Sequence, residues 1–164
     1  VIGGGDWAED RLVPDTMKSF ISGKSVELRN PNAIRPWQHV LDPLNGYLTL
    51  AEHLWEQGSA FAEGWNFGPK DEDARTVGWI VDCLSKIWGE SANWQTNNGT
   101  HPHEANYLKL DSSKSRECLG WKPLLPLNDA LKWTVEWYRG YRNKMDLHPL
   151  TLSQIEQYEG LDKI

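Results

Sequence analysis

The sequence predicts an α/β fold made mostly of helices, with short strands between them. Apolar residues recur at helical spacing in several segments, and brief apolar runs bounded by glycine, proline or asparagine lie between those segments. Strands that alternate with helices along a chain are typical of α/β proteins. The chain has 164 residues, which corresponds to one domain or part of one.

The first half of the chain supplies three of these elements. A helix is predicted over residues 13–22, because four apolar side chains share one face and Gly23 follows as a terminator. A short strand over 25–29 comes next and closes at a turn over 30–32. Residues 34–41 alternate apolar and polar side chains, which is typical of a strand or strand-like loop.

The next helix begins where this extended run stops. Pro36 favours extended backbone at Arg35. Asp42 is expected to be the N-cap of the helix and Pro43 its first residue. Helical apolar spacing then continues to just before Gly58.

The remaining elements follow from the same signals. Thr76 is expected to cap a helix that stops at Gly89, and Asp111 a short helix that ends at Gly120. The other predicted elements are short strands at 65–67, 93–96 and 107–110 and a helix over 128–141.

The composition excludes several classes of partner. The net charge is −6 and no basic run exceeds two residues, so we expect neither a nucleic-acid nor an anionic-membrane surface. No apolar stretch approaches the roughly 18 residues of a membrane-spanning helix. Cys83 and Cys118 lie in helical patterns beside apolar residues, which favours buried reduced thiols in a cytoplasmic protein over a disulfide framework. Most of the ten tryptophans are expected in the core.

The first residues predict a strand end rather than a cofactor loop. Val1 and Ile2 run into Gly3-Gly4-Gly5, so we expect the strand to begin upstream and the chain to be a fragment. The glycines do not satisfy the G-x-G-x-x-G fingerprint of dinucleotide sites, because position 8 is alanine and no helix opens directly after them.

Three arginines are the strongest binding signal. Arg11, Arg29 and Arg35 lie on successive loop or strand elements, so a fold that joins those ends makes a positive pocket for a small anion such as a diphosphate. Arg35 lies beside Trp37, where its planar fork can grip a phosphate, or pair with a carboxylate and cover the ring. The alternative for all three arginines is pairing with nearby carboxylates, which are those of Asp6, Glu9, Asp10 and Glu27.

Other chemical signals are weak. Asn66 and His103 can contact a hydroxyl or a phosphate, although asparagine at a turn is as often structural. His101 and His103 flank a proline and lack the further ligands of a metal site. No serine or cysteine occupies a nucleophile elbow.

The order of motifs resembles the extended short-chain dehydrogenase/reductases, and more narrowly the nucleotide-sugar 4,6-dehydratases. The motifs cover nearly the whole chain, and the Gly-Gly-Gly-Asp-Trp and Arg-Pro-Trp-Gln-His forms are similar to the CDP-glucose branch. They are 1–7, 10–15, 29–31, 35–41, 65–69, 101–104 and 119–123.

This resemblance implies the fold beyond its class. Residues 1–164 would be the C-terminal, substrate-binding portion of an extended NAD(P)-binding Rossmann-type fold. Segments 1–5 and about 40–69 would belong partly to a Rossmann sheet layer whose remainder lies outside this chain.

The resemblance also implies roles for eight residues. Arg35 would hold the pyrophosphate, and Arg11 and Leu12 would open a helix that lines the nucleotide. Glu27 and Arg29 would lie along the base and ribose. The remaining residues are Asn66 at the floor of the site, and His101 and His103 in a closing loop where relatives typically supply an arginine.

The implied chemistry is an internal redox cycle in which bound NAD takes and returns a hydride while water is eliminated from a CDP-sugar. The Tyr-x-x-x-Lys pair of the family is absent, so no catalytic residue is assigned to this chain and NAD is expected to bind elsewhere in the parent. The alternatives are the same portion of a nucleotide-sugar epimerase or reductase, and a protein-interaction module.

The parent is expected to form a homo-oligomer. On the isolated chain, the helix after Pro43 would expose an apolar face and cause self-association or local disorder. The residues of that face are Leu44, Tyr47, Leu48, Ala51, Leu54 and Trp55.

Overall fold

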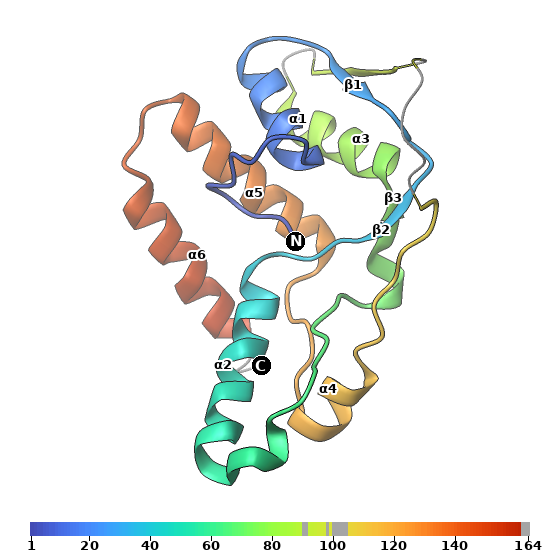
Figure 1. The fold of residues 1–164 in the computed structure, drawn as a ribbon. Helices are drawn as coiled ribbons and strands as arrows, with labels where there is room; N and C mark the ends of the chain where they lie inside the picture. Colours follow the sequence, from blue (N-terminus) through green and yellow to red (C-terminus); the bar gives the residue numbers. More distant parts are fainter. Residues whose placement is uncertain (90–91, 98, 100–104, 162–164) are drawn as a thin grey trace.

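The fold is a helical α/β arrangement in which short strands connect the helices (Figure 1). The computed structural model describes residues 1–89, 92–97, 99 and 105–161. The α/β class predicted from the sequence is confirmed. The elements in chain order are α1 (Leu12–Ile21), β1 (Val26–Leu28), β2 (Ile34–Pro36), α2 (Leu41–Gln57), the 3-10 turns η1 (Gly58–Phe61) and η2 (Asp71–Asp73), β3 (Ala74–Thr76), α3 (Val77–Trp88), β4 (Trp94–Thr96), α4 (Ser113–Leu119), α5 (Leu127–Arg142) and α6 (Leu147–Leu161).

The strands pair in two small sheets. β1 runs parallel to β4, with Val26 opposite Trp94, and β2 runs antiparallel to β3, with Arg35 opposite Arg75. The N-terminal segment adds a single parallel bridge between Ile2 and the residues that lead into α2. These pairings fix where the loops around α1 and β2 lie.

The main core lies where α1, α3 and α5 meet, as Figure 1 shows. Met17 of α1, Ile80 and Leu84 of α3, and Leu131 of α5 are fully buried there. A smaller cluster joins Phe67 to α4 and to Trp121. Apolar burial of this kind stabilises the fold by about 25 cal/mol per Å² removed from water.

Asp42 links distant parts of the chain. Its side chain is fully buried in the first turn of α2. The Oδ1 atom accepts hydrogen bonds from the backbone N–H groups of Leu124 (2.7 Å) and Leu125 (3.4 Å) and from the hydroxyl of Tyr158 (2.9 Å). The backbone carbonyl of Asp42 accepts a bond from the indole of Trp121 (3.2 Å). Desolvation raises the pKa of this carboxyl, and the hydrogen bonds oppose the rise.

The predicted N-cap role of Asp42 is wrong. α2 begins at Leu41 with Val40 at the N-cap, and no side chain caps it. The carboxylate instead serves donors more than 80 residues away in sequence. Three tertiary donors outweigh the single local bond that an N-cap makes.

The predicted strand at 65–67 does not form within the described residues. Its polar backbone groups and those just after it are satisfied by side chains, which removes the need for a strand partner. Gln38 donates to the carbonyl of Phe67 (2.6 Å), and the hydroxyl of Ser112 accepts from the N–H of Gly68 (2.7 Å).

Two further differences concern the C-terminal half. The predicted strand at 107–110 is reduced to one bridge between Tyr107 and Ile34. Helix α6 was not predicted, because its apolar residues are not gathered on one face; its buried residues are Gln154 and Tyr158.

The predicted cap at Thr76 is confirmed, whereas the one at Asp111 is displaced by one residue. The hydroxyl of Thr76 accepts the N–H of Trp79 (3.2 Å) at the start of α3. Ser112 is the N-cap residue of α4, one residue after the predicted Asp111, and Asp111 accepts the N–H of Ser113 (2.9 Å). The short strands expected near 25–29 and 93–96 are present as β1 and β4.

Helix α2 leaves most of its surface uncovered. Of its 17 residues only Asp42, Pro43 and Gly46 are buried, and Trp55 is 90% exposed. Gly46 lies against Phe67 so closely that a Cβ would come within 2.3 Å of the ring. The exposure expected for the apolar face of this helix is therefore present on the described chain.

The two cysteines are both free, but Cys118 is exposed and Cys83 half-buried, so the expectation that both are buried is wrong. None of the helices within the described residues has the length and apolar character needed to cross a bilayer.

Asp42 supplies a prediction about stability. Asp42→Ala should lower the free energy of unfolding by about 3 kcal/mol, because two N–H groups and a hydroxyl lose their acceptor. Asp42→Asn keeps one oxygen and should cost only about 1 kcal/mol. Denaturant unfolding measures both, with exposed Glu52→Ala on the same helix as the control. Equal losses for Asp42→Ala and Glu52→Ala would contradict the linking role.

His39 predicts how stability depends on pH. Its ring is buried beside Trp133, and burial lowers its pKa to about 4. The folded state therefore resists the proton that the unfolded state accepts below a pKa of about 6.5. Stability should be retained above that value and decline by up to about 3 kcal/mol as the pH falls toward 4.

His39→Gln isolates this effect, because the opposing contribution of Asp42 is present in both proteins and cancels in the difference. The stability curve of the variant should be flatter between pH 6.5 and pH 4. Parallel curves for the two proteins would show that the histidine does not couple folding to protonation.

Candidate functional site

A cavity that contains predicted site residues lies between the start of α1, strand β1 and strand β2. Its volume is about 620 Å³, within the range of small-molecule sites of about 300–1,000 Å³. Its lining comes from separate segments of the chain around α1, β1 and β2, so no single sequence motif defines it. The predicted positions that line it are Arg11, Leu12, Glu27, Arg29 and Arg35.

Arg35 is the middle residue of β2 and is half-buried. Its Nη1 donates to the carbonyls of Ile34 (2.9 Å) and Ala105 (2.7 Å). The neighbouring Trp37 ring is buried, lines the same cavity, and donates its indole N–H to the carbonyl of Arg75 (2.9 Å). These bonds hold a guanidinium and an aromatic ring together on one wall.

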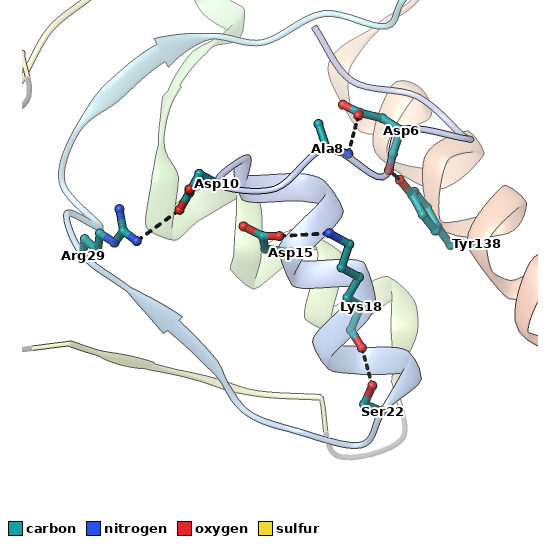
Figure 2. Close-up of polar contacts among 8 residues, drawn as sticks. All are labelled: Asp6, Ala8, Asp10, Asp15, Lys18, Ser22, Arg29 and Tyr138. Carbon is teal, nitrogen blue, oxygen red and sulfur yellow. Dashed lines mark hydrogen bonds and ion pairs between the residues drawn. The ribbon is translucent and has the colours of Figure 1, made fainter.

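The other two arginines meet carboxylates on the N-terminal loop. Arg11 pairs with Asp6 (3.3 Å) and Arg29 with Asp10 (3.2 Å), and Figure 2 shows Arg29 reaching across to Asp10. Both arginine side chains are more than half exposed. Exposed ion pairs contribute about 0–1 kcal/mol, so an incoming anion can displace them at little cost.

The expected positive pocket is not positive by count. Three arginines line the cavity against four carboxylates, so the alternative of local pairing describes Arg11 and Arg29 in this structure. The carboxylates are those of Asp6, Asp10, Asp15 and Glu27. The net charge of the described lining therefore does not support the expected positive pocket.

Glu27 lies at the centre of β1 and is exposed toward the cavity mouth. Its carboxylate accepts hydrogen bonds from the side-chain amides of Asn97 (3.0 Å) and Gln95 (3.5 Å). The parallel pairing of β1 with β4 brings these residues together. Sequence reasoning missed both amides, because pairing across about 70 residues leaves no local signal.

The N-terminus of α1 forms another wall. Residues 11–15 line the cavity, and no side chain caps the helix. Unpaired N–H groups and the helix dipole favour negative charge at such an end. The loop before it is fixed by a hydrogen bond from the Tyr138 hydroxyl to the Asp6 carbonyl, visible in Figure 2.

Of the other three predicted site residues, one lies away from the cavity and two fall outside the described residues. Asn66 does not line the cavity; it is exposed beside α4 and donates to the carbonyl of Asp111 (3.1 Å). His101 and His103 lie outside the described residues. The described site therefore consists of five of the eight predicted positions, together with Trp37.

The described residues do not fit a dinucleotide cofactor such as NAD. Dinucleotide sites use a glycine turn at the edge of a large parallel sheet, whereas the sheets here have two strands each. Gly4 lies against Trp137, where a Cβ would come within 2.1 Å of the ring. The glycine run therefore packs on an indole and leaves no room for a pyrophosphate at that point.

Comparison with known proteins finds relatives among the sugar-nucleotide dehydratases. No family model matches the chain. It is 49% identical over 158 residues to CDP-glucose 4,6-dehydratase of Salmonella typhimurium. The matched region covers 96% of this chain and 44% of that protein. The chain is 26% identical over 135 residues to dTDP-glucose 4,6-dehydratase of the same species, covering 79% and 36%.

The fold agrees with this relationship. UDP-glucuronic acid 4-epimerase of Bacillus cereus, solved with UDP-glucuronic acid and NAD, superimposes with a TM-score of 0.72 at 20% identity, over 86% of this chain and 43% of that one. The described fold is therefore that of the matching part of a sugar-nucleotide epimerase. The chain is similar to CDP-glucose 4,6-dehydratase over nearly its whole length, and it shares its fold with dTDP-glucose 4,6-dehydratase of Bacillus anthracis (TM-score 0.66). It spans less than half the length of these relatives.

The exposed ion pairs lead to a prediction about anion binding. Asp10→Asn should change stability by less than about 0.5 kcal/mol and raise affinity for inorganic pyrophosphate a few-fold, because Arg29 loses its competitor. The gain should shrink as salt is added. Calorimetric titration checks this, with Glu156→Gln on α6 as the matched loss of one charge. Weaker pyrophosphate binding in Asp10→Asn would show that Asp10 is itself part of the site.

Proposed function

We propose that this chain is the nucleotide-sugar-binding part of a CDP-glucose 4,6-dehydratase, the lyase that converts CDP-glucose to CDP-4-keto-6-deoxyglucose. The observation that carries the proposal is the cavity of about 620 Å³ in which Arg35, Arg11 and Arg29 lie near an uncapped helix start. The 49% identity to the Salmonella enzyme supports the CDP-glucose substrate over other sugar nucleotides.

In this proposal the cavity binds the nucleotide and the chemistry is performed elsewhere. Arg35 holds the pyrophosphate, Arg11 and Leu12 line it, and Glu27 and Arg29 lie along the base and ribose. Asn66, His101 and His103 are proposed to approach the sugar or phosphates when the nucleotide is bound. NAD and the catalytic residues belong to other parts of the enzyme, so this chain alone is expected to be inactive.

The second candidate is the same portion of a nucleotide-sugar epimerase, which the superposition on the Bacillus cereus epimerase favours. A protein-interaction module is a third possibility. Nucleotide titration separates the third from the first two, because such a module is indifferent to CDP. The identity of the base that binds most tightly helps separate the first two.

The uncovered face of α2 belongs to the same proposal. We propose that this face packs on the cofactor-binding part of the parent enzyme and that the isolated chain associates with itself through it, since Tyr47, Leu48 and Trp55 are exposed there. Sedimentation at several concentrations reports this directly. The free cysteines support a cytoplasmic location, and we propose no nucleic-acid or membrane partner.

The test of the proposed function is CDP binding. Arg35→Ala should weaken it by about 2 kcal/mol, or roughly thirty-fold, because a charge-assisted bond to phosphate is lost. Arg35→Lys should recover only part, since an ammonium lacks the planar fork. Arg116→Ala, an exposed arginine of α4, is the control and should bind normally. CDP affinity equal in Arg35→Ala and in the unsubstituted chain would overturn the phosphate role.

A further inference from the structure

We propose that Glu27 selects the base, by accepting a hydrogen bond from the 4-amino group of cytosine, and so makes the cavity prefer cytidine over uridine diphosphates. The inference rests on the proposed function, because it needs a nucleotide in this cavity. It goes further in assigning a single side chain to the choice of base, which neither the relatives nor the cavity shape specifies.

The position of Glu27 along β1 supports this assignment. Glu27 is the middle residue of β1, and Arg29 directly follows the last residue of that strand. Both are exposed and line the cavity, together with the buried Val26 and Leu28. This part of the cavity therefore offers a carboxylate for a hydrogen-bond donor, next to the arginine that is proposed to lie along the ribose.

The neighbours of Glu27 fix its carboxylate as an acceptor. Asn97 donates to Oε2 (3.0 Å) and Gln95 donates to Oε1 (3.5 Å), so each oxygen has an amide partner from the β4 side. Each carboxylate oxygen has two acceptor positions, so a further donor can still bind. The two amides orient the group without neutralising its charge.

Cytosine and uracil differ in the group at position 4 that would face the Glu27 carboxylate. Cytosine carries an amino donor at position 4, whereas the corresponding atom of uracil and thymine is the carbonyl acceptor O4. A carboxylate accepts only, so it attracts the first and repels the second. Carboxylate side chains are the usual acceptors for the cytosine amino group in nucleic-acid recognition.

Glu27→Gln tests the proposal, because it keeps the size of the side chain and gives it a donor as well as an acceptor. CDP and UDP are titrated by calorimetry at one ionic strength into the unsubstituted chain, Glu27→Gln and Glu9→Gln. Glu9 is exposed, does not line the cavity and controls for the loss of one negative charge. Thermal unfolding of each protein verifies that the fold is intact.

The unsubstituted chain should bind CDP about tenfold more tightly than UDP, and Glu27→Gln should bring that ratio close to one. Glu9→Gln should keep the full preference. CDP binding with the same CDP-to-UDP ratio in Glu27→Gln overturns the role of Glu27 and leaves the proposed function standing. Failure of the unsubstituted chain to bind either nucleotide overturns both.

Discussion

The buried carboxylate of Asp42 is the interaction on which the rest of the structure depends. It joins the first turn of α2 to the segment before α5 and to Tyr158 of α6, while its own carbonyl receives Trp121. Only seven positions separate it from Arg35 along the chain. The segment between Arg35 and Asp42 also pairs with Ile2 through a β-bridge at His39. Anchoring Asp42 therefore helps to position Arg35 on the cavity wall.

The charges that line the cavity nearly balance, so the position of each charged side chain matters more than their sum. Arg11 and Arg29 rest on exposed carboxylates that an anion can displace, whereas the Arg35 guanidinium is held by two backbone carbonyls. Glu27 is oriented in turn by amides from a strand that lies far away in sequence. In the proposed function, Arg35 on β2 therefore holds the phosphates and Glu27 on β1 faces the base.

Local signals in the sequence predicted much of the fold. The cap at Thr76 and the spacing of apolar residues predicted α1, α2, α3 and α5 with boundaries correct to within a few residues. These signals succeed because caps and periodicity act over a single turn. The arginines of the site were predicted, but their pairing with Asp6 and Asp10 was left as an alternative. Long-range bonds explain what was missed: Asp42 serves donors beyond residue 120, and Gln95 and Asn97 reach Glu27 only through a parallel pairing.

The most direct test of the account places CDP in the cavity by spectroscopy. In a chain with isotope-labelled indole nitrogens, the Trp37 signal should shift on CDP addition, because this ring lines the cavity and its N–H bonds to Arg75. The Trp121 signal should stay in place, because its N–H is engaged at Asp42 away from the cavity lining. An unchanged Trp37 signal at saturating CDP would contradict the assignment of the nucleotide to this cavity.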